Sequence, residues 1–397
     1  MIQEEKPMKF DFDAPVDRHG TGCLKYDFAV ERGKPADILP LWVADMDFRT
    51  APPVVEALKK RVEHGIFGYV RVPDAYYETV AGWFAGRHNW QIEKEWIIYT
   101  TGVVPALSAV IKALTTSGDK VVVQTPVYNC FFSSIRNNGC EVITSPLVYE
   151  NGTYQMDFID LEQKVADLGV KVLLLCNPHN PAGRVWTKQE LTRLGEICLR
   201  NDVWVVSDEI HCELVFPGHT YIPFASVSEE FQMHSITCTS PSKAFNLAGI
   251  QIANIVSADA DIRMKIDKAI NINEVCDVNP FGIEALMAAY TDGVEWLEEL
   301  NRYLFANYHY LRAYFDEYLP EFSVVSLEGT YLVWVDCSVL KQSSEAIMKT
   351  LLDKEKLWIN EGSLYGEAGE GFIRINIACP RQQLIEGLKR LRQVLKQ

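Results

Sequence analysis

Short apolar runs recur along the chain and predict strands that are buried on both faces. They lie at residues 121–123, 171–176, 203–207 and 235–239, and continuous runs of this length are typical of central strands in parallel sheets. Amphipathic helical patterns alternate with them, and the pattern that begins at Thr187 opens on a capping box. This alternation predicts an α/β fold with a largely parallel, doubly wound sheet.

The pattern changes in the last third of the chain. A long amphipathic helix has core positions from Trp296 to Leu311, and two further strands are expected at residues 329–336 and 372–378, before a final helix. The beginning of the chain is rich in Asp, Pro and Gly and shows little periodicity, as expected for an arm that lies on another part of the protein. We therefore predict a large α/β domain at residues 48–287 and a smaller α+β domain formed by residues 1–47 and 288–397.

Polar loops follow three of the predicted strands. The sequence NPHNPAG begins at Asn177, DEIH begins at Asp208 and SPSK begins at Ser240, each directly after an apolar run. In open α/β sheets, ligands bind outside the carboxyl ends of the strands. We therefore predict that Asn180, Asp208 and Lys243 gather at one edge of the sheet.

Lys243 is the leading candidate for chemistry. A lysine held where a strand ends, among small hydroxyl residues, can have its amine partly desolvated and available for Schiff-base formation. Alone, this is a weak signal, because most lysines in loops are solvated surface charges. The neighbouring strand ends, which carry Asn180 and Asp208, favour the chemical interpretation.

Two further places could hold anionic groups. The sequence TTG at residues 100–102 leads into a predicted helix whose first N–H groups form an anion site, although an ordinary strand-to-helix turn would look the same. Arg374 alternates with Ile373 and Ile375 in a predicted strand, so its side chain faces away from the apolar side. There it could bind a carboxylate with a bidentate fork or pair with an exposed acid.

Composition excludes several classes of protein. The net charge of −15 argues against nucleic acid or an anionic membrane as a partner, because both need clustered positive charge. The ten cysteines form no CxxC pair, no signal-peptide pattern is visible in the first residues, and no apolar run approaches a membrane span. We therefore expect a cytoplasmic, globular protein, and we expect no metal site.

Four motifs in order carry a resemblance over nearly the whole chain. The motifs NPxNPxG, DEIH, SxSK and FIRIN, the last around Arg374, resemble those of the fold-type-I pyridoxal-phosphate enzymes, the aspartate aminotransferase superfamily. Within it, LPLWVADMDF at residues 39–48 and TPVY at residues 125–128 resemble the MalY/PatB-type cystathionine β-lyases. The resemblance implies pyridoxal 5'-phosphate as cofactor, a large domain with a mostly parallel seven-stranded sheet, a smaller α+β domain, and a homodimer.

The same resemblance implies roles for the strand-end residues. Lys243 would hold the cofactor covalently and later move the substrate α-proton, and Asp208 would pair with the pyridine nitrogen. Asn180 would donate to the ring phenolate oxygen, and Tyr128 would stack on the ring. Their ordinary alternatives are a surface amine, a helix cap, a turn residue and core packing.

The resemblance also implies contacts to phosphate and substrate. Expected at the phosphate are Gly102, Val103, Val104, Ser240, Ser242 and, from a neighbouring subunit, Tyr69. Expected at the substrate are Arg374, Val43, Ala44 and Asn180. Two positions depart from the aminotransferase pattern: His211 stands where many relatives carry a tyrosine, and Gln251 where many carry a phosphate-binding arginine. Both departures fit the lyase subgroup better.

The function follows from this subgroup. We predict β-elimination from cystathionine or a related sulfur amino acid, with release of a thiol, pyruvate and ammonia; the alternative is an aminotransferase. The sequence SPSK at residues 240–243 also matches the S-x-x-K pattern of serine acyl-enzymes, but that serine should open a helix and the companion K-T-G is missing. A third possibility is a non-enzymatic role in binding another protein, for which the sequence offers no motif.

Overall fold

The structure is a computed structural model, and it describes residues 8–274 and 277–396. Its centre is a seven-stranded sheet with the order β2-β10-β9-β8-β7-β3-β4. These strands are β2 (Ile97–Thr100), β3 (Lys120–Val123), β4 (Glu141–Thr144), β7 (Val170–Cys176), β8 (Trp204–Asp208), β9 (Ser235–Thr239) and β10 (Ala253–Val256). Only β10 runs antiparallel to its neighbours, so the predicted mostly parallel, seven-stranded sheet is confirmed.

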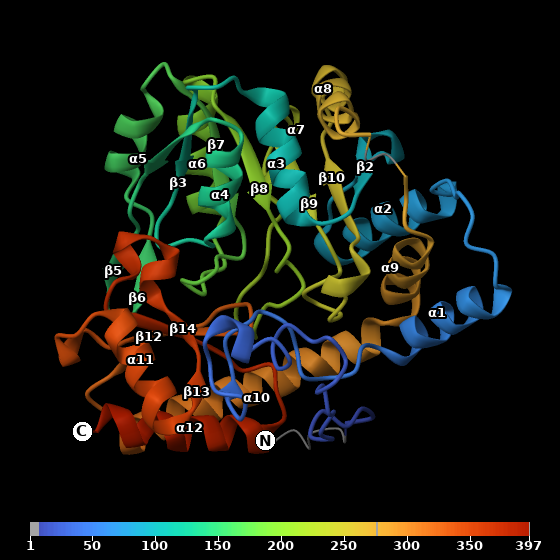
Figure 1. Cartoon of the computed structure of the whole chain (residues 1–397). Coiled ribbons are helices and arrows are strands. Elements are labelled where there is room, and N and C mark those ends of the chain that lie inside the picture. The colour runs from blue at the N-terminus through green and yellow to red at the C-terminus, as the bar shows by residue number, and fades with distance from the viewer. Residues whose placement is uncertain (1–7, 275–276, 397) are drawn as a thin grey trace, which may run out of the picture.

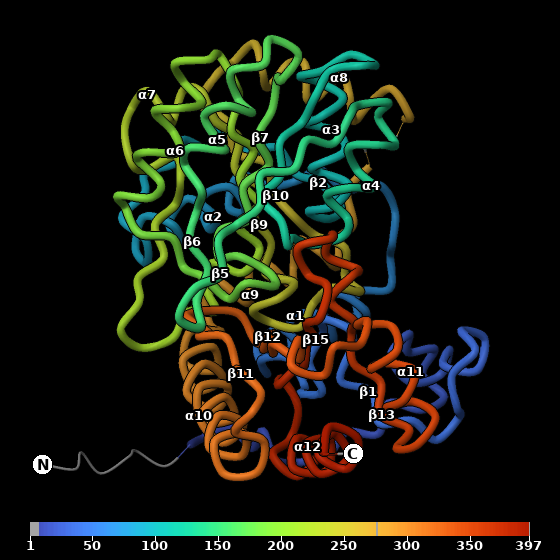
Figure 2. The backbone as a smooth tube through the Cα atoms, turned by 90° about the vertical axis from the view of Figure 1, so that its left-hand side faces the viewer, coloured from blue at the N-terminus to red at the C-terminus, as the bar shows by residue number. Residues whose placement is uncertain are grey.

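Helices cover both faces of this sheet, as Figure 2 shows from the side. One layer contains α5 (Phe158–Val165), α6 (Lys188–Arg200) and α7 (Glu229–Met233), and the other contains α3 (Val103–Leu114), α4 (Cys130–Asn137) and α8 (Ala260–Asn271). Alternate strand residues pack into the two layers: Leu173 and Leu175 lie in one hydrophobic cluster, and Val172 and Leu174 lie in the other. The apolar runs are continuous because both faces of these strands are buried.

A second sheet lies below the first in Figure 1, next to the C-terminal helices. Its order is β11-β12-β15-β14, and all its pairs are antiparallel. These strands are β11 (Ser323–Val324), β12 (Leu332–Asp336), β14 (Asn360–Glu361) and β15 (Phe372–Asn376), and the helices beside them are α10 (Val294–Tyr318), α11 (Ser344–Glu355) and α12 (Arg381–Leu395). The division into domains at residues 47/48 and 287/288 stays a prediction.

The remaining elements connect these two sheets. They are α1 (Pro52–His64), α2 (Asp74–His88), α9 (Pro280–Asp292), the paired strands β1 (Leu39–Pro40) and β13 (Leu357–Trp358), and the hairpin of β5 (Val148–Glu150) and β6 (Thr153–Gln155). Helix α1 begins on two consecutive prolines, and Gly65, whose φ of 73° lies in the left-handed region, closes it. Pairing of β1 with β13 fixes the start of the segment at residues 39–48 against the C-terminal part of the chain.

Two further expectations concern the whole chain. The nine cysteines within the described residues are free, and Cys176, Cys198 and Cys238 are buried, as their apolar surroundings predict. Across residues 8–274 and 277–396, no helix combines the length and apolar character needed to cross a membrane.

Candidate active site

A cavity of about 300 Å³ lies at the carboxyl ends of β7, β8 and β9, and most of the predicted site residues line it. Those that line it are Ala44, Gly102, Val103, Val104, Tyr128, Asn180, Asp208, His211, Ser242 and Lys243. We call this cavity the catalytic pocket. The predicted meeting of Asn180, Asp208 and Lys243 at one sheet edge is therefore observed.

Lys243 enters the catalytic pocket from the turn after β9. Its Nζ donates a hydrogen bond of 2.6 Å to the carbonyl oxygen of Ala44. Burial lowers the pKa of Lys243 to about 8, although the charge of Asp45 opposes the shift. Since an ordinary lysine has a pKa near 10.4, far more of this amine is neutral and nucleophilic at neutral pH.

The lowered pKa gives a testable pH dependence. In cofactor-free protein, the rate at which trinitrobenzenesulfonate labels Lys243 is expected to rise through a midpoint near pH 8, because only the neutral amine reacts. Peptide mass spectrometry would measure the labelling. Asp45→Asn should move the midpoint lower, since the carboxylate stabilises the ammonium form. A midpoint near pH 10.4 would show that Lys243 is an ordinary solvated lysine.

Asp208 is the last residue of β8 and is buried beside the catalytic pocket. Burial raises the pKa of its carboxyl group to about 7, while the charge of Lys243 acts in the opposite direction. Within the described residues its side chain accepts one hydrogen bond, from the backbone N–H of Ile210 at 3.1 Å. A buried carboxylate with an oxygen still available is suited to a positively charged N–H donor in the pocket.

Gly102 stands at the N-terminus of α3, where the pocket meets the backbone N–H groups of the first helical turn. This turn has no side-chain cap and contains no acidic residue. The free N–H groups and the helix dipole therefore favour an anion at this end of the pocket. Ser242 lines the pocket beside them.

Ser240, which was expected at the phosphate, has its hydroxyl engaged elsewhere. Its Oγ donates to the carbonyl oxygen of Ile252 at 2.5 Å and accepts from the backbone N–H of Ser242 at 3.1 Å. It also follows β9 rather than opening a helix. These contacts argue against the serine acyl-enzyme alternative, which requires a free nucleophilic hydroxyl at a helix start.

Arg374 on β15 is buried next to the pocket rather than exposed. Its two terminal nitrogens donate to Asn180 Oδ1 at 3.1 Å and to the carbonyl oxygen of Trp42 at 2.8 Å, and its guanidinium lies 4.9 Å from the centre of the Tyr365 ring. Its Nε has no hydrogen-bond partner among the described residues. The guanidinium is thus oriented by neutral groups and keeps N–H donors for an anionic ligand.

The backbone of residues 42–46 passes the catalytic pocket, where Ala44 lines the wall and the adjacent Val43 is not among the lining residues. Asn376 Nδ2 donates to the carbonyl oxygens of Val43 and Asp45 at 2.6 and 2.7 Å, and the Tyr331 hydroxyl donates to that of Ala44 at 3.0 Å. Sequence reasoning missed both donors. The alternation of Asn376 with Arg374 in one strand was a usable signal for the first, whereas Tyr331 gave none.

An ionic cluster holds this wall in place, and it consists of Arg18, Lys25, Asp45 and Asp47. Lys25, which is fully buried, lies 2.7 Å from Asp47 and 3.5 Å from Asp45, and Arg18 contacts the same two carboxylates at 2.7 and 2.6 Å. The cluster fixes the N-terminal arm to the wall of the catalytic pocket.

Replacing Lys25 with methionine is expected to lower the free energy of unfolding by about 3–5 kcal/mol, because it leaves buried carboxylates without one of their cations. Urea denaturation of the cofactor-loaded protein would measure the loss. Lys9→Met is the matched control: Lys9 pairs with Glu295 at an exposed position, with side chains 64% and 53% exposed, so its loss should change the free energy of unfolding far less. Equal effects of the two substitutions would contradict the anchoring role.

His211 and Tyr128 complete the pocket lining. Burial lowers the pKa of His211 well below its usual value, and the positive charges of Lys243 and Arg374 lower it further, so its ring is neutral. Its Nδ1 has no hydrogen-bond partner. Burial also raises the pKa of the Tyr128 hydroxyl, which therefore stays protonated. Both side chains can contact a ligand as neutral groups.

Tyr69 does not reach the catalytic pocket of its own chain. It is 94% exposed, in a loop with Ile66 and Phe67, which are 67% and 55% exposed.

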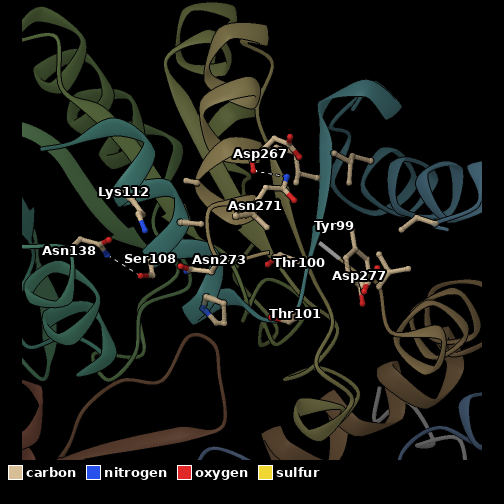
Figure 3. A pocket seen from close by; sticks show the side chains of 18 of the residues that line it. Tyr99, Thr100, Thr101, Ser108, Lys112, Asn138, Asp267, Asn271, Asn273 and Asp277 are labelled. Carbon is tan, nitrogen blue, oxygen red and sulfur yellow. Dashed lines mark hydrogen bonds between the residues drawn. The ribbon is translucent and has the colours of Figure 1, made fainter. Parts of the chain in front are cut away.

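A polar cavity of about 650 Å³ adjoins the catalytic pocket and shares Thr101 and Pro105 with it. Figure 3 shows this cavity, with Thr100 and Thr101 beside it and Asn138 bonded to Ser108 on the α3 side.

The chain matches the family model described as aminotransferase class I and II over residues 36–391. It is 41% identical over 385 residues to the cystathionine beta-lyase PatB of Bacillus subtilis (strain 168), and the alignment covers 97% of this chain and 100% of the relative.

Two solved structures are also similar over almost their full length. A PLP-bound protein from Clostridium difficile 630, named an aminotransferase, superposes with a TM-score of 0.95 at 44% identity and covers 97% of this chain and 100% of its own. The PLP-bound C-S lyase of Staphylococcus hominis superposes with a TM-score of 0.92 at 33% identity and covers 98% and 99%. The fold described above thus has counterparts that extend over nearly the whole chain.

Proposed function

This chain belongs to the aminotransferase class I and II family, and from that premise we propose that it is a pyridoxal 5'-phosphate-dependent carbon–sulfur β-lyase. It cleaves L-cystathionine or a related cysteine S-conjugate to a thiol, pyruvate and ammonia. The observation that carries this proposal is the full-length similarity to a cystathionine beta-lyase and to a C-S lyase, together with the gathering of Lys243, Asp208 and Asn180 in one pocket. The fold and the lyase interpretation drawn from the sequence agree with these similarities.

The pocket fits the cofactor in three ways. Lys243 offers a partly neutral amine for its aldehyde, the available oxygen of Asp208 suits its pyridine nitrogen, and the uncapped N-terminus of α3 at Gly102 suits its phosphate. We propose further contacts from Tyr128 with the ring face and from Asn180 with the phenolate oxygen. His211 and the hydroxyls of Ser240 and Ser242 would complete the cofactor contacts, with the Ser240 hydroxyl freed from Ile252.

Different residues of the chain then have different roles in the reaction. When bound, pyridoxal phosphate supplies an electron sink for the charge that develops at the substrate α-carbon. Arg374 binds the substrate carboxylate, and the backbone at Val43 and Ala44 closes the pocket on the same side. Lys243 Nζ removes the α-proton, which its lowered pKa allows near neutral pH.

A direct experiment separates the lyase from the aminotransferase alternative. Purified, cofactor-loaded protein is incubated with L-cystathionine without any 2-oxo acid, and pyruvate is measured over time. Pyruvate that exceeds the enzyme concentration many times supports β-elimination. A single conversion that stops, and resumes when a 2-oxo acid is added, would establish an aminotransferase and refute the lyase proposal.

We also propose that the active unit is a cytoplasmic homodimer in which Tyr69 completes the site of the neighbouring subunit. Its high exposure, next to exposed Ile66 and Phe67, supports this proposal, because such a patch usually marks an interface. Free buried cysteines fit a reducing compartment.

The shared site can be tested by complementation. Tyr69→Ala and Lys243→Ala chains are each expected to be nearly inactive, and coexpression should restore activity, because a mixed dimer contains one site with both residues intact. Sedimentation would establish the dimer. Mixed dimers without any recovered activity would refute a shared site.

A further inference from the structure

A second cavity, of about 970 Å³, lies between α10, the end of α2 and the loop at residues 212–221. We call it the α10 groove. Figure 1 shows α10 below the large sheet, and the α2 side of the molecule lies above it. The residues that line this groove are different from those that line the catalytic pocket.

Three arginines and three histidines line the α10 groove, although the chain as a whole has a net charge of −15. The lining includes Arg87, His88, His219, Arg302, His309 and Arg381. Some are paired at the rim, since Arg302 lies 3.4 Å from Glu299 and His219 lies 3.9 Å from Glu328. Among the described residues that line the groove, the one carboxylate is that of Glu213. A concave surface with this balance favours an anionic ligand.

Glu213 is bonded to Arg87 and His88, so these two side chains are engaged and the preference for an anion rests on Arg381. Glu213 Oε1 accepts from Trp83 Nε1 at 2.7 Å and contacts His88 Nε2 at 2.6 Å, and its Oε2 accepts from Arg87 Nε at 2.9 Å. Within the described residues, His88, Cys212 and Glu213 are the one group with the spacing to hold a metal ion. The occupied carboxylate and the adjacent guanidinium argue against a cation there.

The terminal N–H groups of Arg381 remain available to a ligand in the α10 groove. Its Nε donates to Asn307 Oδ1 at 2.6 Å, and its guanidinium lies 4.9 Å from the centre of the Tyr310 ring. Within residues 8–274 and 277–396, its two terminal nitrogens make no hydrogen bond or ion pair. A guanidinium held in this way presents a fork that matches a carboxylate.

Asn301 supplies an acceptor without a partner. Its Nδ2 donates to the carbonyl oxygen of Glu213 at 2.8 Å, which fixes the orientation of the amide, because a carbonyl can only accept. Its Oδ1 is buried and has no hydrogen-bond partner in the part of the chain that the structure describes. A ligand with an N–H or O–H group would satisfy it.

Aromatic rings form much of the remaining wall: Phe216, Tyr221, Tyr303, Phe305 and Tyr310. Rings of this kind bind planar apolar bodies by stacking and edge contacts. Together with the free fork of Arg381 and the acceptor of Asn301, they define the chemistry of the occupant. We propose that the α10 groove is a second small-molecule site, that it binds a small aromatic carboxylate bearing a hydrogen-bond donor, and that its occupancy affects the catalytic pocket.

The effect on catalysis follows from a shared wall. Asp208 and His211 line the catalytic pocket, whereas Cys212 and Glu213, in the same short segment, line the α10 groove. Between them, buried Glu209 accepts a hydrogen bond from the hydroxyl of Tyr221, which is itself part of the groove. A ligand that moves the groove side of this segment therefore acts on the residues that face the cofactor.

Calorimetric titration of the cofactor-loaded protein with 4-hydroxybenzoate tests the binding, which does not depend on the proposed reaction. We expect one site per chain, and at least about tenfold weaker binding of 4-hydroxybenzamide, which has the same shape without the charge. Arg381→Met and His309→Glu should each weaken binding, and His309 is exposed, so its replacement tests the site without risk to folding. Arg193→Met, on α6 outside the groove, is the matched control.

Two results would overturn the site. One is no binding to any form of the protein. The other is binding that Arg374→Met abolishes and Arg381→Met leaves unchanged, since the probe would then occupy the catalytic pocket. For the coupling, saturating probe should change the turnover number of the cofactor-loaded enzyme at saturating substrate in the parent chain but not in Arg381→Met. Binding that leaves the turnover number unchanged would refute the coupling.

Discussion

Replacing Lys243 with alanine is expected to reduce pyruvate formation from L-cystathionine by at least about 10³-fold, because a positioned general base alone contributes about 10²–10⁴-fold. The amine also provides the covalent attachment for the cofactor, so the variant should lose the absorbance of the attached form. Steady-state pyruvate release and the absorbance spectrum would measure the two effects separately. The structure supports both roles, since the amine lies in the catalytic pocket with a pKa lowered to about 8.

Lys265→Ala is the control for this substitution, because Lys265 lies on the exposed side of α8. It should retain parental activity. Added methylamine should partly restore the Lys243→Ala variant, since a small amine can occupy the space left by the side chain and accept the α-proton. An alanine variant with near-parental activity would show that another base removes the proton, and the assignment of Lys243 would be wrong.

The parts of the site that could be predicted are those that local sequence fixes. The strand from Ser235 to Thr239 was predicted with its observed bounds, and Asp208 and Asn180 were placed correctly at the same edge. Doubly buried strands leave a continuous apolar run, and the polar residues that follow must lie at the carboxyl edge of a parallel sheet. A prediction of this kind needs only the direction of the strands and not their order.

Contacts between distant parts of the chain could not be predicted in this way. Lys243 bonds to the carbonyl oxygen of Ala44, 199 residues away, and Arg374 bonds to Asn180, 194 residues away. Neither pairing leaves a periodic signal, because each depends on how the second sheet docks on the first. The buried cluster of Lys25, Arg18, Asp45 and Asp47 was missed for the same reason, since isolated charges in an aperiodic arm resemble a solvated surface.

Tyr69 and Ser240 show the limit of carrying roles over from a resemblance. The resemblance implies that Ser240 contacts the phosphate and that Tyr69 reaches the phosphate of a neighbouring subunit. In a single chain Tyr69 is exposed to solvent, and the Ser240 hydroxyl is bonded to the backbone. A role that depends on a second subunit or on a bound ligand has no signature in one chain. This is why the complementation test for Tyr69 needs two different chains in one dimer.

Replacing Asp208 with asparagine is expected to lower the rate of β-elimination by about 10²–10³-fold, the range measured when one preorganised electrostatic contact is removed. The substitution keeps the size of the side chain but removes the charge that would hold the pyridine nitrogen protonated. Pyruvate release would measure the loss, and Asp202→Asn, at a side chain that is 94% exposed, is the control. Full activity in Asp208→Asn would contradict the assigned role.

When the cofactor is absent, Asp208→Asn should be more stable than the parent protein. If the carboxylate had only a structural role, its replacement would not increase the stability. Burial raises the pKa of Asp208 to about 7 from its ordinary value near 3.9, so its favourable contribution to folding is present below about pH 4 and is lost as the pH rises through 7. Asparagine lacks this titration. Urea unfolding of the two cofactor-free proteins would measure the difference in their free energies of unfolding. The advantage of Asp208→Asn should grow between pH 5 and 8. An advantage that is independent of pH would mean that burial does not destabilise the carboxylate. A residue that reduces the stability of the empty protein and raises the rate of the loaded one is placed there for the cofactor.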